Sequence, residues 1–271
     1  MSEQSLRMPT YFISHGGGPW PWIKDMLPMD MSILERSLQA MPAEIGVAPR
    51  AVLMVSGHWE TGRFTVQTNP NPPMVYDYGG FPEFTYHIQY PAPGAPDVAA
   101  RVTELLTGAG IRVDQDAERG YDHGVFAPAY AIWPKADVPI LQLSIKHDFD
   151  PAAHLAAGRA LAPLRDEGVV IIGSGLSYHN LRAFGPGAAR PSAEFDAWLS
   201  DALLAHQGAE RSALLERWAA APSARIAHPT EDHLIPLMVA VGAAEGDPAH
   251  RTYHETMMAG GITASSFRFG R

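Results

Sequence analysis

Three histidines in the sequence stand close behind apolar segments that are typical of buried strands. His15 follows the run TYFIS, His58 follows AVLMVSG, and His179 comes four positions after GVVIIGSG. A neutral imidazole is a common ligand of Zn(II) and Fe(II), and histidine also titrates near neutral pH. The pattern therefore predicts a metal site or an acid–base site at the ends of strands.

Glycines next to two of these histidines favour the same interpretation. Gly57 precedes His58, and Gly16, Gly17 and Gly18 follow His15. Glycine permits backbone conformations that other residues rarely adopt and lets a metal or a substrate approach the chain closely. We therefore expect the loops at these strand ends to face a ligand.

His233 is a fourth candidate ligand in a different setting. Thr230 is a suitable N-cap for a helix that contains LIPLMVAVGAA, which would place Glu231, Asp232 and His233 in the first turn. The positive end of a helix dipole disfavours imidazolium and keeps the ring available to a metal. The alternative is that His233 only caps the helix.

His123 lies beside Asp122 in GYDHGVFAP, a turn-like segment in which it either hydrogen-bonds a substrate or braces a loop. The remaining histidines stand in polar or helical-surface contexts and are interpreted as structural: His87, His147, His154, His206, His228, His250 and His254.

The absence of other motifs narrows the chemistry. No cysteine is present, which excludes thiolate metal sites and leaves histidine and carboxylate as ligands. HGGGP has neither the spacing of a dinucleotide fingerprint nor a phosphate-loop lysine, Ser174 lacks the GxSxG context, and no HExxH occurs. The sequence therefore favours a metal site assembled from distant residues.

Composition excludes several classes of partner. The 271 residues carry a formal net charge of -9 without a basic cluster, so we expect no nucleic-acid partner. The start MSEQSLRMPTYFIS lacks the pattern of a secretory signal, and no apolar stretch reaches the length of a membrane span. We expect a cytoplasmic protein without a membrane partner, and no feature indicates its oligomeric state.

Alternating strand and helix patterns must position the histidines. Strands are predicted at 10–14, 51–56, 63–68, 138–146, 168–175 and 262–270, and helices at 31–41, 97–107, 154–168, 194–206, 209–219 and 234–244. This order predicts an α/β fold, one domain over residues 1–271, with a central mostly parallel or mixed sheet flanked by helices. The proline-rich segment 69–96 is predicted to be an ordered loop that walls a pocket.

Ligands of open α/β sheets bind beyond the carboxyl ends of the strands, so His15, His58 and His179 are expected to converge. Several motifs stand in an order that resembles one family: SHGGGP (14–19), SGHWE (56–60), GGFPEFTYHIQYPAPG (79–94), DHG (122–124), QLSI (142–145), GSGLSYHNLR (173–182) and HPTEDHLIPL (228–237). The chain resembles the 4,5-DOPA extradiol dioxygenases. These belong to the class III extradiol dioxygenases related to the protocatechuate 4,5-dioxygenase β-subunit.

The resemblance implies a non-haem metal enzyme that opens the ring of a catechol-type aromatic diol with O2. It implies that His15, His58 and His233 bind the metal, that His179 is the catalytic acid–base residue, and that His123 contacts the substrate. Fe(II) is implied for activity, and Zn(II) also suits three neutral imidazoles.

In the wider superfamily the third ligand is a glutamate. The resemblance implies that His233 takes that position in this chain. Glu231 and Asp232 therefore stay open as partners of the ligands or as a carboxylate ligand. Many members have a serine and a single glycine after the first histidine, whereas this chain has three glycines and then PWPW. Trp20 and Trp22 of that segment either line an aromatic pocket or pack in the core. Two other hypotheses use the same histidines: a zinc-dependent hydrolase, and a non-catalytic protein that binds a metal or a small aromatic compound.

Overall fold

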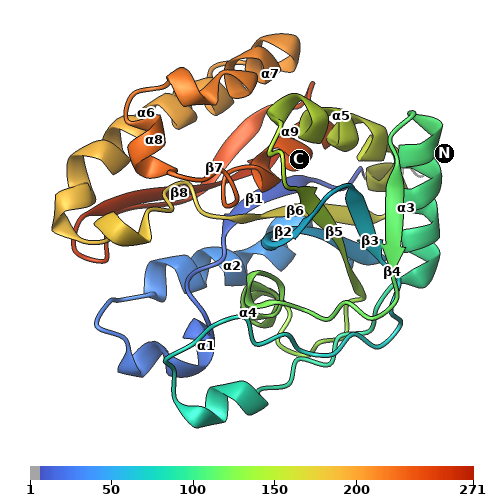
Figure 1. Cartoon of the computed structure of the whole chain (residues 1–271), viewed down its shortest axis with the longest axis horizontal. Coiled ribbons are helices and arrows are strands. Elements are labelled where there is room, and N and C mark those ends of the chain that lie inside the picture. The colour runs from blue at the N-terminus through green and yellow to red at the C-terminus, as the bar shows by residue number, and fades with distance from the viewer. Residues whose placement is uncertain (1–6) are drawn as a thin grey trace.

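One mixed sheet of eight strands forms the centre of the computed structural model, which describes residues 7–271 (Figure 1). The strands are Thr10–Ser14 (β1), Ala51–Thr61 (β2), Phe64–Gln67 (β3), Val113–Asp116 (β4), Ile140–Lys146 (β5), Val169–Gly175 (β6), Ala249–Met258 (β7) and Ile262–Phe269 (β8). Their order is β4-β3-β5-β2-β6-β1-β8-β7. β5, β2, β6 and β1 are parallel neighbours, so their carboxyl ends share one edge.

Helices cover both faces of the sheet (Figure 1). The α-helices are Trp20–Ile23 (α1), Ser32–Ile45 (α2), Pro96–Gly108 (α3), His123–Ile132 (α4), Pro151–Leu161 (α5), Ala189–Leu204 (α6), Gly208–Glu216 (α7), Ala224–Ala227 (α8) and Pro236–Ala243 (α9). The 3-10 helices are Lys24–Met26, Glu83–His87, Ala162–Glu167, Leu181–Ala183, Pro186–Ala188 and Trp218–Ala220. α2 and α4 lie on one face, and α3, α5 and α9 lie on the other (Figure 1). None of these helices is long and apolar enough to cross a membrane.

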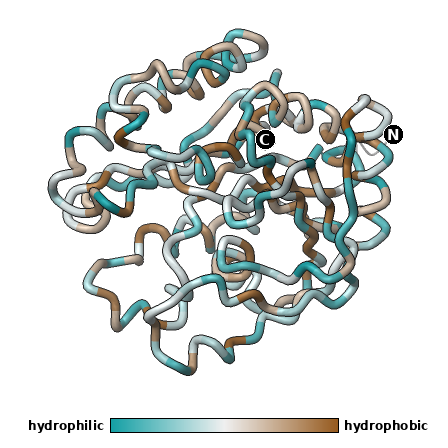
Figure 2. Tube along the Cα trace, in the orientation of Figure 1, coloured by the Kyte–Doolittle hydropathy of each residue, from teal (hydrophilic) through white to brown (hydrophobic). Residues whose placement is uncertain are grey.

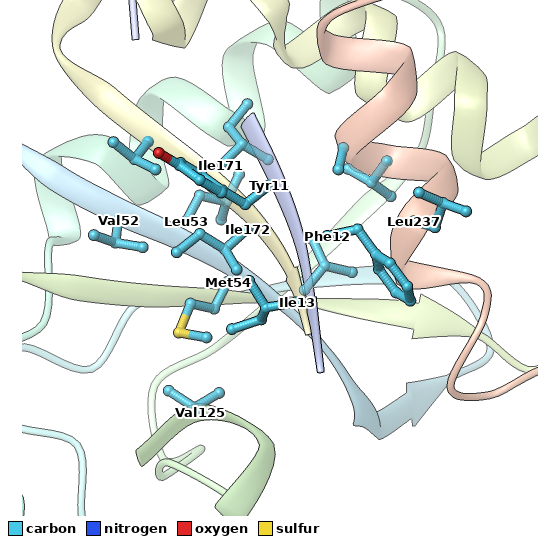
Figure 3. Packing of buried hydrophobic residues seen from close by; sticks show 14 of the residues in the cluster. Tyr11, Phe12, Ile13, Val52, Leu53, Met54, Val125, Ile171, Ile172 and Leu237 are labelled. Carbon is cyan, nitrogen blue, oxygen red and sulfur yellow. The ribbon is translucent and has the colours of Figure 1, made fainter. Parts of the chain in front are cut away.

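The core lies between the parallel strands and these two helical layers. Figure 3 shows Phe12 of β1 beside Leu237 of α9, whereas Met54 of β2 lies on the side of Val125 of α4. All four side chains are fully buried. Apolar residues accordingly concentrate along the central strands (Figure 2), which is expected when both faces of a parallel sheet are covered.

The predicted α/β class and the flanked, mixed sheet are confirmed. Two strands were not predicted, β4 and β7, and they occupy the two edges of the sheet. Both are mostly polar and only partly buried, so they lack the apolar run that identified the central strands.

Two helix boundaries near the candidate histidines differ from the prediction. Helix α9 begins at Pro236, so His233 lies in the turn before the helix and Thr230 is not its N-cap. The segment around His123 is not a turn, because His123 is the first residue of α4. α4 is apolar on all sides and buried almost throughout, and its sequence therefore shows no amphipathic period.

The predicted helix from His154 to Gly168 begins earlier, at Pro151. The side chain of Asp150 accepts a hydrogen bond from the backbone N–H of Ala152 and caps this helix. The helical segment ends at Gly168, as predicted, and this glycine caps the following 3-10 helix in a left-handed conformation.

Candidate metal centre

Three imidazole rings converge at the carboxyl edge of the parallel strands. His15 follows β1, His58 lies in β2, and His233 lies in the turn before α9. The Nε2 atom of His58 is 3.3 Å from Nε2 of His15 and 3.2 Å from Nε2 of His233. The structure thus brings together the three residues that the sequence singled out as metal ligands.

The predicted position of His58 beyond the end of its strand is wrong. β2 continues to Thr61, so His58 lies inside the strand. Pairing of β2 with β6 stops at Ser56, and its register with β5 shifts between Val55 and Glu60. The irregularity spans His58. A local break in the ladder therefore accompanies the ligand position, as bulges near active sites often do.

Two glycines let the turn that carries His233 pack onto the strand ends. A Cβ atom at Gly57 would lie 2.7 Å from the carbonyl oxygen of Asp232, and one at Gly175 would overlap the carbonyl oxygen of His233. The backbone N–H of Leu176 donates to that same carbonyl at 3.1 Å. Only glycine at these positions permits such close backbone contact.

Carboxylates hold the outer nitrogens of two of the rings. Nδ1 of His58 is 3.3 Å from a carboxylate oxygen of Asp77, and Nδ1 of His233 is 2.5 Å from a carboxylate oxygen of Asp232. Because a carboxylate accepts hydrogen bonds, each Nδ1 carries the proton and each Nε2 presents its lone pair to the centre. Histidine ligands of metals are commonly oriented in this way.

A hydroxyl group holds the third ring. Nδ1 of His15 is 3.1 Å from the hydroxyl oxygen of Ser174, whose own hydroxyl donates to the carbonyl oxygen of Gly124. The serine oxygen is therefore left to accept a hydrogen bond from His15. This ring too presents an unprotonated Nε2 to the other two.

Burial keeps the three rings neutral. It lowers the pKa of His15 well below its usual range, with repulsion from His58 as the next cause. It lowers the pKa of His58 to about 4 and that of His233 to about 3. Three neutral nitrogen acceptors that face one another have no proton to share, so the arrangement fits a divalent metal ion with nitrogen ligands.

His179 lies against the ring of His233. Its ring stacks on that of His233 with 3.4 Å between the centroids and an interplanar angle of 16°. Its Nδ1 is 3.7 Å from a carboxylate oxygen of Asp232, and burial lowers its pKa although that carboxylate opposes the shift. The side chain keeps 19% exposure, so a neutral ring nitrogen is accessible beside the centre.

His123 borders the centre from the other side. Its ring centroid is 4.0 Å from that of His58, and its Nδ1 is 2.9 Å from Asp77. Its backbone N–H donates to the same carboxylate oxygen at 3.0 Å. Asp77 therefore fixes both the ring and the backbone of His123 at the start of α4.

Asp77 is the main site residue that the sequence analysis did not identify. Its two carboxylate oxygens contact different histidines, one His58 and the other His123. Burial alone would raise the pKa of Asp77, but the hydrogen bond from His123 keeps it below its usual value. The only signal in the sequence was its place in the predicted pocket-lining loop, 69–96.

Asp232 plays the equivalent part on the opposite side. Burial would raise its pKa, but the hydrogen bond from His233 holds the pKa well below the ordinary range. Its other oxygen is 2.5 Å from the hydroxyl of Thr230. Glu231 instead pairs with Arg225 at 2.7 Å, so of the two open carboxylates only Asp232 contacts one of the three converging histidines.

Asp122 supports the site from beneath. It is fully buried and accepts hydrogen bonds from the hydroxyl of Ser56 at 2.7 Å and from Arg119 at 2.6 Å. These contacts join the ligand strand β2 to the start of α4. Asp122 therefore has a structural role, whereas the next residue, His123, faces the centre.

The five histidines form the floor of a cavity of about 720 Å³. Asp77 and Phe81 contribute to its wall, which confirms that the proline-rich loop lines a pocket. Trp20 also lines the cavity and donates a hydrogen bond to the carbonyl oxygen of His15 at 2.7 Å. Trp22 instead stacks on Tyr130 at 4.4 Å, so one tryptophan of the pair belongs to the pocket.

The other histidines do not line this cavity. Two of them were wrongly placed in surface contexts, because His154 and His228 are fully buried. Each is tied to backbone: Nε2 of His154 accepts from the N–H of Lys146, and Nε2 of His228 lies 3.0 Å from the carbonyl oxygen of Ser177. Their structural interpretation agrees with these contacts.

Comparison with known proteins identifies the family. The model of the "catalytic LigB subunit of aromatic ring-opening dioxygenase" matches residues 28–270. A 4,5-DOPA dioxygenase extradiol of Beta vulgaris is 37% identical over 99% of this chain and 98% of its own length. The protein of the same name from Escherichia coli is 33% identical over 98% of this chain and 96% of its own length.

The fold agrees with the same assignment. The crystal structure of the uncharacterized protein JW3007 from Escherichia coli K12 matches with a TM-score of 0.79 and 31% identity, over 97% of this chain and 100% of that one. These similarities support a ring-opening dioxygenase and give no support to a zinc hydrolase. The chain belongs to the LigB family of aromatic ring-opening dioxygenases.

Proposed function

We propose that this protein cleaves the ring of a catechol-type aromatic diol with O2, at a metal ion held by His15, His58 and His233. The observation that carries the proposal is the convergence of three neutral Nε2 atoms, with 3.2 and 3.3 Å between neighbours, on the floor of a cavity. Three protein ligands leave further coordination positions for substrate and O2.

Fe(II) is the metal that we propose for activity, because its redox chemistry allows O2 to react with a catechol when both are bound. The ligand set fits Zn(II) equally well, since all three ligands are neutral imidazoles. None of the three ligands adds negative charge, so the site is suited to a substrate that has lost its hydroxyl protons.

His179 is proposed to accept a hydroxyl proton from the catechol and to return it during ring opening. Its Nδ1 faces Asp232, which leaves Nε2 for the substrate. The lowered pKa makes the ring neutral at the start of the reaction, as a general base requires. The developing imidazolium is stabilised by the same carboxylate.

His123 is proposed to orient the substrate. Asp77 holds the proton on its Nδ1, so Nε2 is left as an acceptor for a catechol hydroxyl. The anchored backbone at the start of α4 fixes the direction of that acceptor. Together His123 and His179 would bracket the diol on the two sides of the metal position.

We also propose that the whole chain, residues 1–271, is a single catalytic domain. The proposed ligands lie directly after β1, in β2 and in the turn before α9, so one centre requires segments from both ends of the chain. The sheet that positions them contains both β1 and the C-terminal strand β8 as neighbours.

The test begins with anaerobic purification of the protein with no metal added, followed by determination of its metal content. O2 uptake is then measured with a panel of catechols. The Fe(II)-loaded protein should consume one O2 per catechol and form a yellow semialdehyde that contains both atoms of that O2. No O2 uptake across the panel would contradict the proposal.

A further inference from the structure

The wall of the cavity above the histidines is strongly apolar. It is formed by four separate segments: the stretch before α2, the proline-rich loop 69–96, the loop after His179 and the end of β7. A diol at the metal position would occupy only the floor, so the wall is left to contact a ring substituent. Its principal side chains are Leu27, Met29, Phe81, Leu181, Phe184 and Met258.

No lysine or arginine lines this cavity within residues 7–271. The charged residues in its lining, apart from the histidines, are the acids Glu60, Asp77 and Asp232. Asp77 and Asp232 hold ligand histidines, and Glu60 is 3.5 Å from Nδ1 of His147. A substrate carboxylate would therefore lose water without gaining a cationic partner and would meet negative charge.

One cation that reaches the strand of His58, Arg119, is already engaged. Arg119 donates to Asp122 at 2.6 Å and lies over the ring of Trp59 at 5.1 Å. It does not belong to the cavity lining. Using it to bind a carboxylate would break the buried ion pair that supports the start of α4.

The rim shows where a substituent would lie. Leu181 is 70% exposed and Phe184 is 37% exposed, although both are large apolar residues. Both follow His179 in one loop and line the cavity together with the buried Met258. Such exposure of neighbouring apolar side chains at a pocket mouth is typical of a surface that binds an apolar ligand.

We infer that the preferred substrate of this site is a catechol with an apolar, uncharged ring substituent rather than one with a carboxylate. The inference rests on the proposed ring-cleaving function and adds its substrate class. Burial of an uncharged substituent against the apolar wall favours binding, whereas a carboxylate there loses hydration free energy that no cationic contact offsets.

The test compares matched substrates on the Fe(II)-loaded protein. 4-Propylcatechol and the methyl ester of 3-(3,4-dihydroxyphenyl)propanoate are neutral, and the free acid has the same ring and nearly the same length. We expect kcat/KM for the neutral compounds to exceed that for the acid by about tenfold or more, which corresponds to about 1.4 kcal/mol. Anaerobic calorimetric titration should show the same order of affinity.

The two proposals fail in different ways. If the acid is turned over as well as the neutral catechols or better, the substrate class is wrong and the ring-cleaving function stands. If no catechol drives O2 uptake, the proposed function is wrong, and the anaerobic titration still decides whether the pocket prefers the neutral compounds.

A charge placed on the rim gives an independent test. Leu181→Lys should raise kcat/KM for the acid about fivefold to tenfold and lower it for 4-propylcatechol, because the missing cation is then supplied. Leu204→Lys is the matched control, since Leu204 is an exposed leucine at the end of α6 that does not line the cavity. An unchanged ratio of the two substrates in Leu181→Lys would overturn the assignment of the rim.

Discussion

At the scale of single residues, the chemistry of this site depends on the partners of the outer ring nitrogens. His233 donates to a carboxylate, Nδ1 of His58 faces another at 3.3 Å, and His15 donates to a serine oxygen, so all three Nε2 atoms face inward without protons. The same ring type serves a different purpose at His179, whose Nδ1 is 3.7 Å from its carboxylate and whose other nitrogen is accessible. The partners of the ring nitrogens, more than residue type, therefore divide the histidines into proposed ligands and a proposed base.

Replacing the proposed base should separate metal binding from turnover. In His179→Gln we expect the metal content to be retained and kcat to fall by about 10²–10⁴, because general base catalysis typically contributes that much. Metal analysis and O2 uptake on the same preparation measure both quantities. Loss of metal in this variant would instead place His179 among the ligands.

Asp77→Asn should weaken the site through two histidines at once. It removes the charge that orients His58 and His123, so we expect metal affinity to fall about 10-fold to 100-fold and kcat/KM to fall as well. Chelator competition measures the affinity.

The matched control for that experiment is Asp114→Asn. Asp114 is a largely exposed aspartate on the edge strand β4, 3.8 Å from Arg63. An affinity in Asp77→Asn no lower than in this control would show that Asp77 does not position the ligands.

At the scale of elements, the site depends on how closely a turn approaches strand ends. The turn with His233 rests on Gly175 of β6 and on Gly57 of β2, and backbone contact replaces side-chain packing at both places. This close packing sets the distance of the His233 ring from the rings of His15 and His58. The position of His233 is thus set by the packing of the turn on β2 and β6 and not by any local motif.

Gly175→Ala should lift that turn away from the strand. Its added methyl group would overlap the carbonyl oxygen of His233, so we expect a loss of about 1–3 kcal/mol in the free energy of unfolding and at least a tenfold loss of metal affinity. Urea denaturation and chelator competition provide the two measurements.

Gly187→Ala is a suitable control, since a Cβ atom there would meet no atom within 4 Å. Its effect on stability should stay within about 0.5 kcal/mol. Equal behaviour of the two variants would contradict the close-packing argument.

At the scale of the whole molecule, neutral buried histidines make stability depend on pH. His154 and His228 lie outside the metal centre, and burial lowers the pKa of each to about 4. The unfolded chain binds protons at these groups near pH 6.5, whereas the folded chain does not until about pH 4. Their contribution is therefore present above pH 6.5 and is lost as the pH falls towards 4.

Removing one of these groups should flatten the acid limb of the stability curve. With metal chelated throughout, the loss of unfolding free energy between pH 7.5 and pH 5 should be about 2 kcal/mol smaller in His154→Gln than in the parent protein. Urea denaturation at the two pH values measures the difference. His250→Gln, at an exposed histidine, should leave the slope unchanged, and the same slope in both variants would refute the assignment.

The sequence by itself determined the α/β class, the central strands and the identity of the histidines that meet at the centre. These features carry local signals: continuous apolar runs mark strands that are buried on both faces, and glycine next to histidine marks positions where the chain approaches the centre closely. Motif order added the family and the roles that it implies. The polar edge strands β4 and β7 and the all-apolar helix α4 had no such signal.

Only the tertiary structure decided how those residues divide their work. The bridge of Asp77 between His58 and His123, the choice of Asp232 over Glu231, and the position of His233 before α9 all join segments far apart or depend on turn geometry. The apolar wall without a cation is likewise assembled from four distant segments. Hydrogen-bond direction and pocket polarity arise from distances between such segments, and no local sequence pattern encodes those distances.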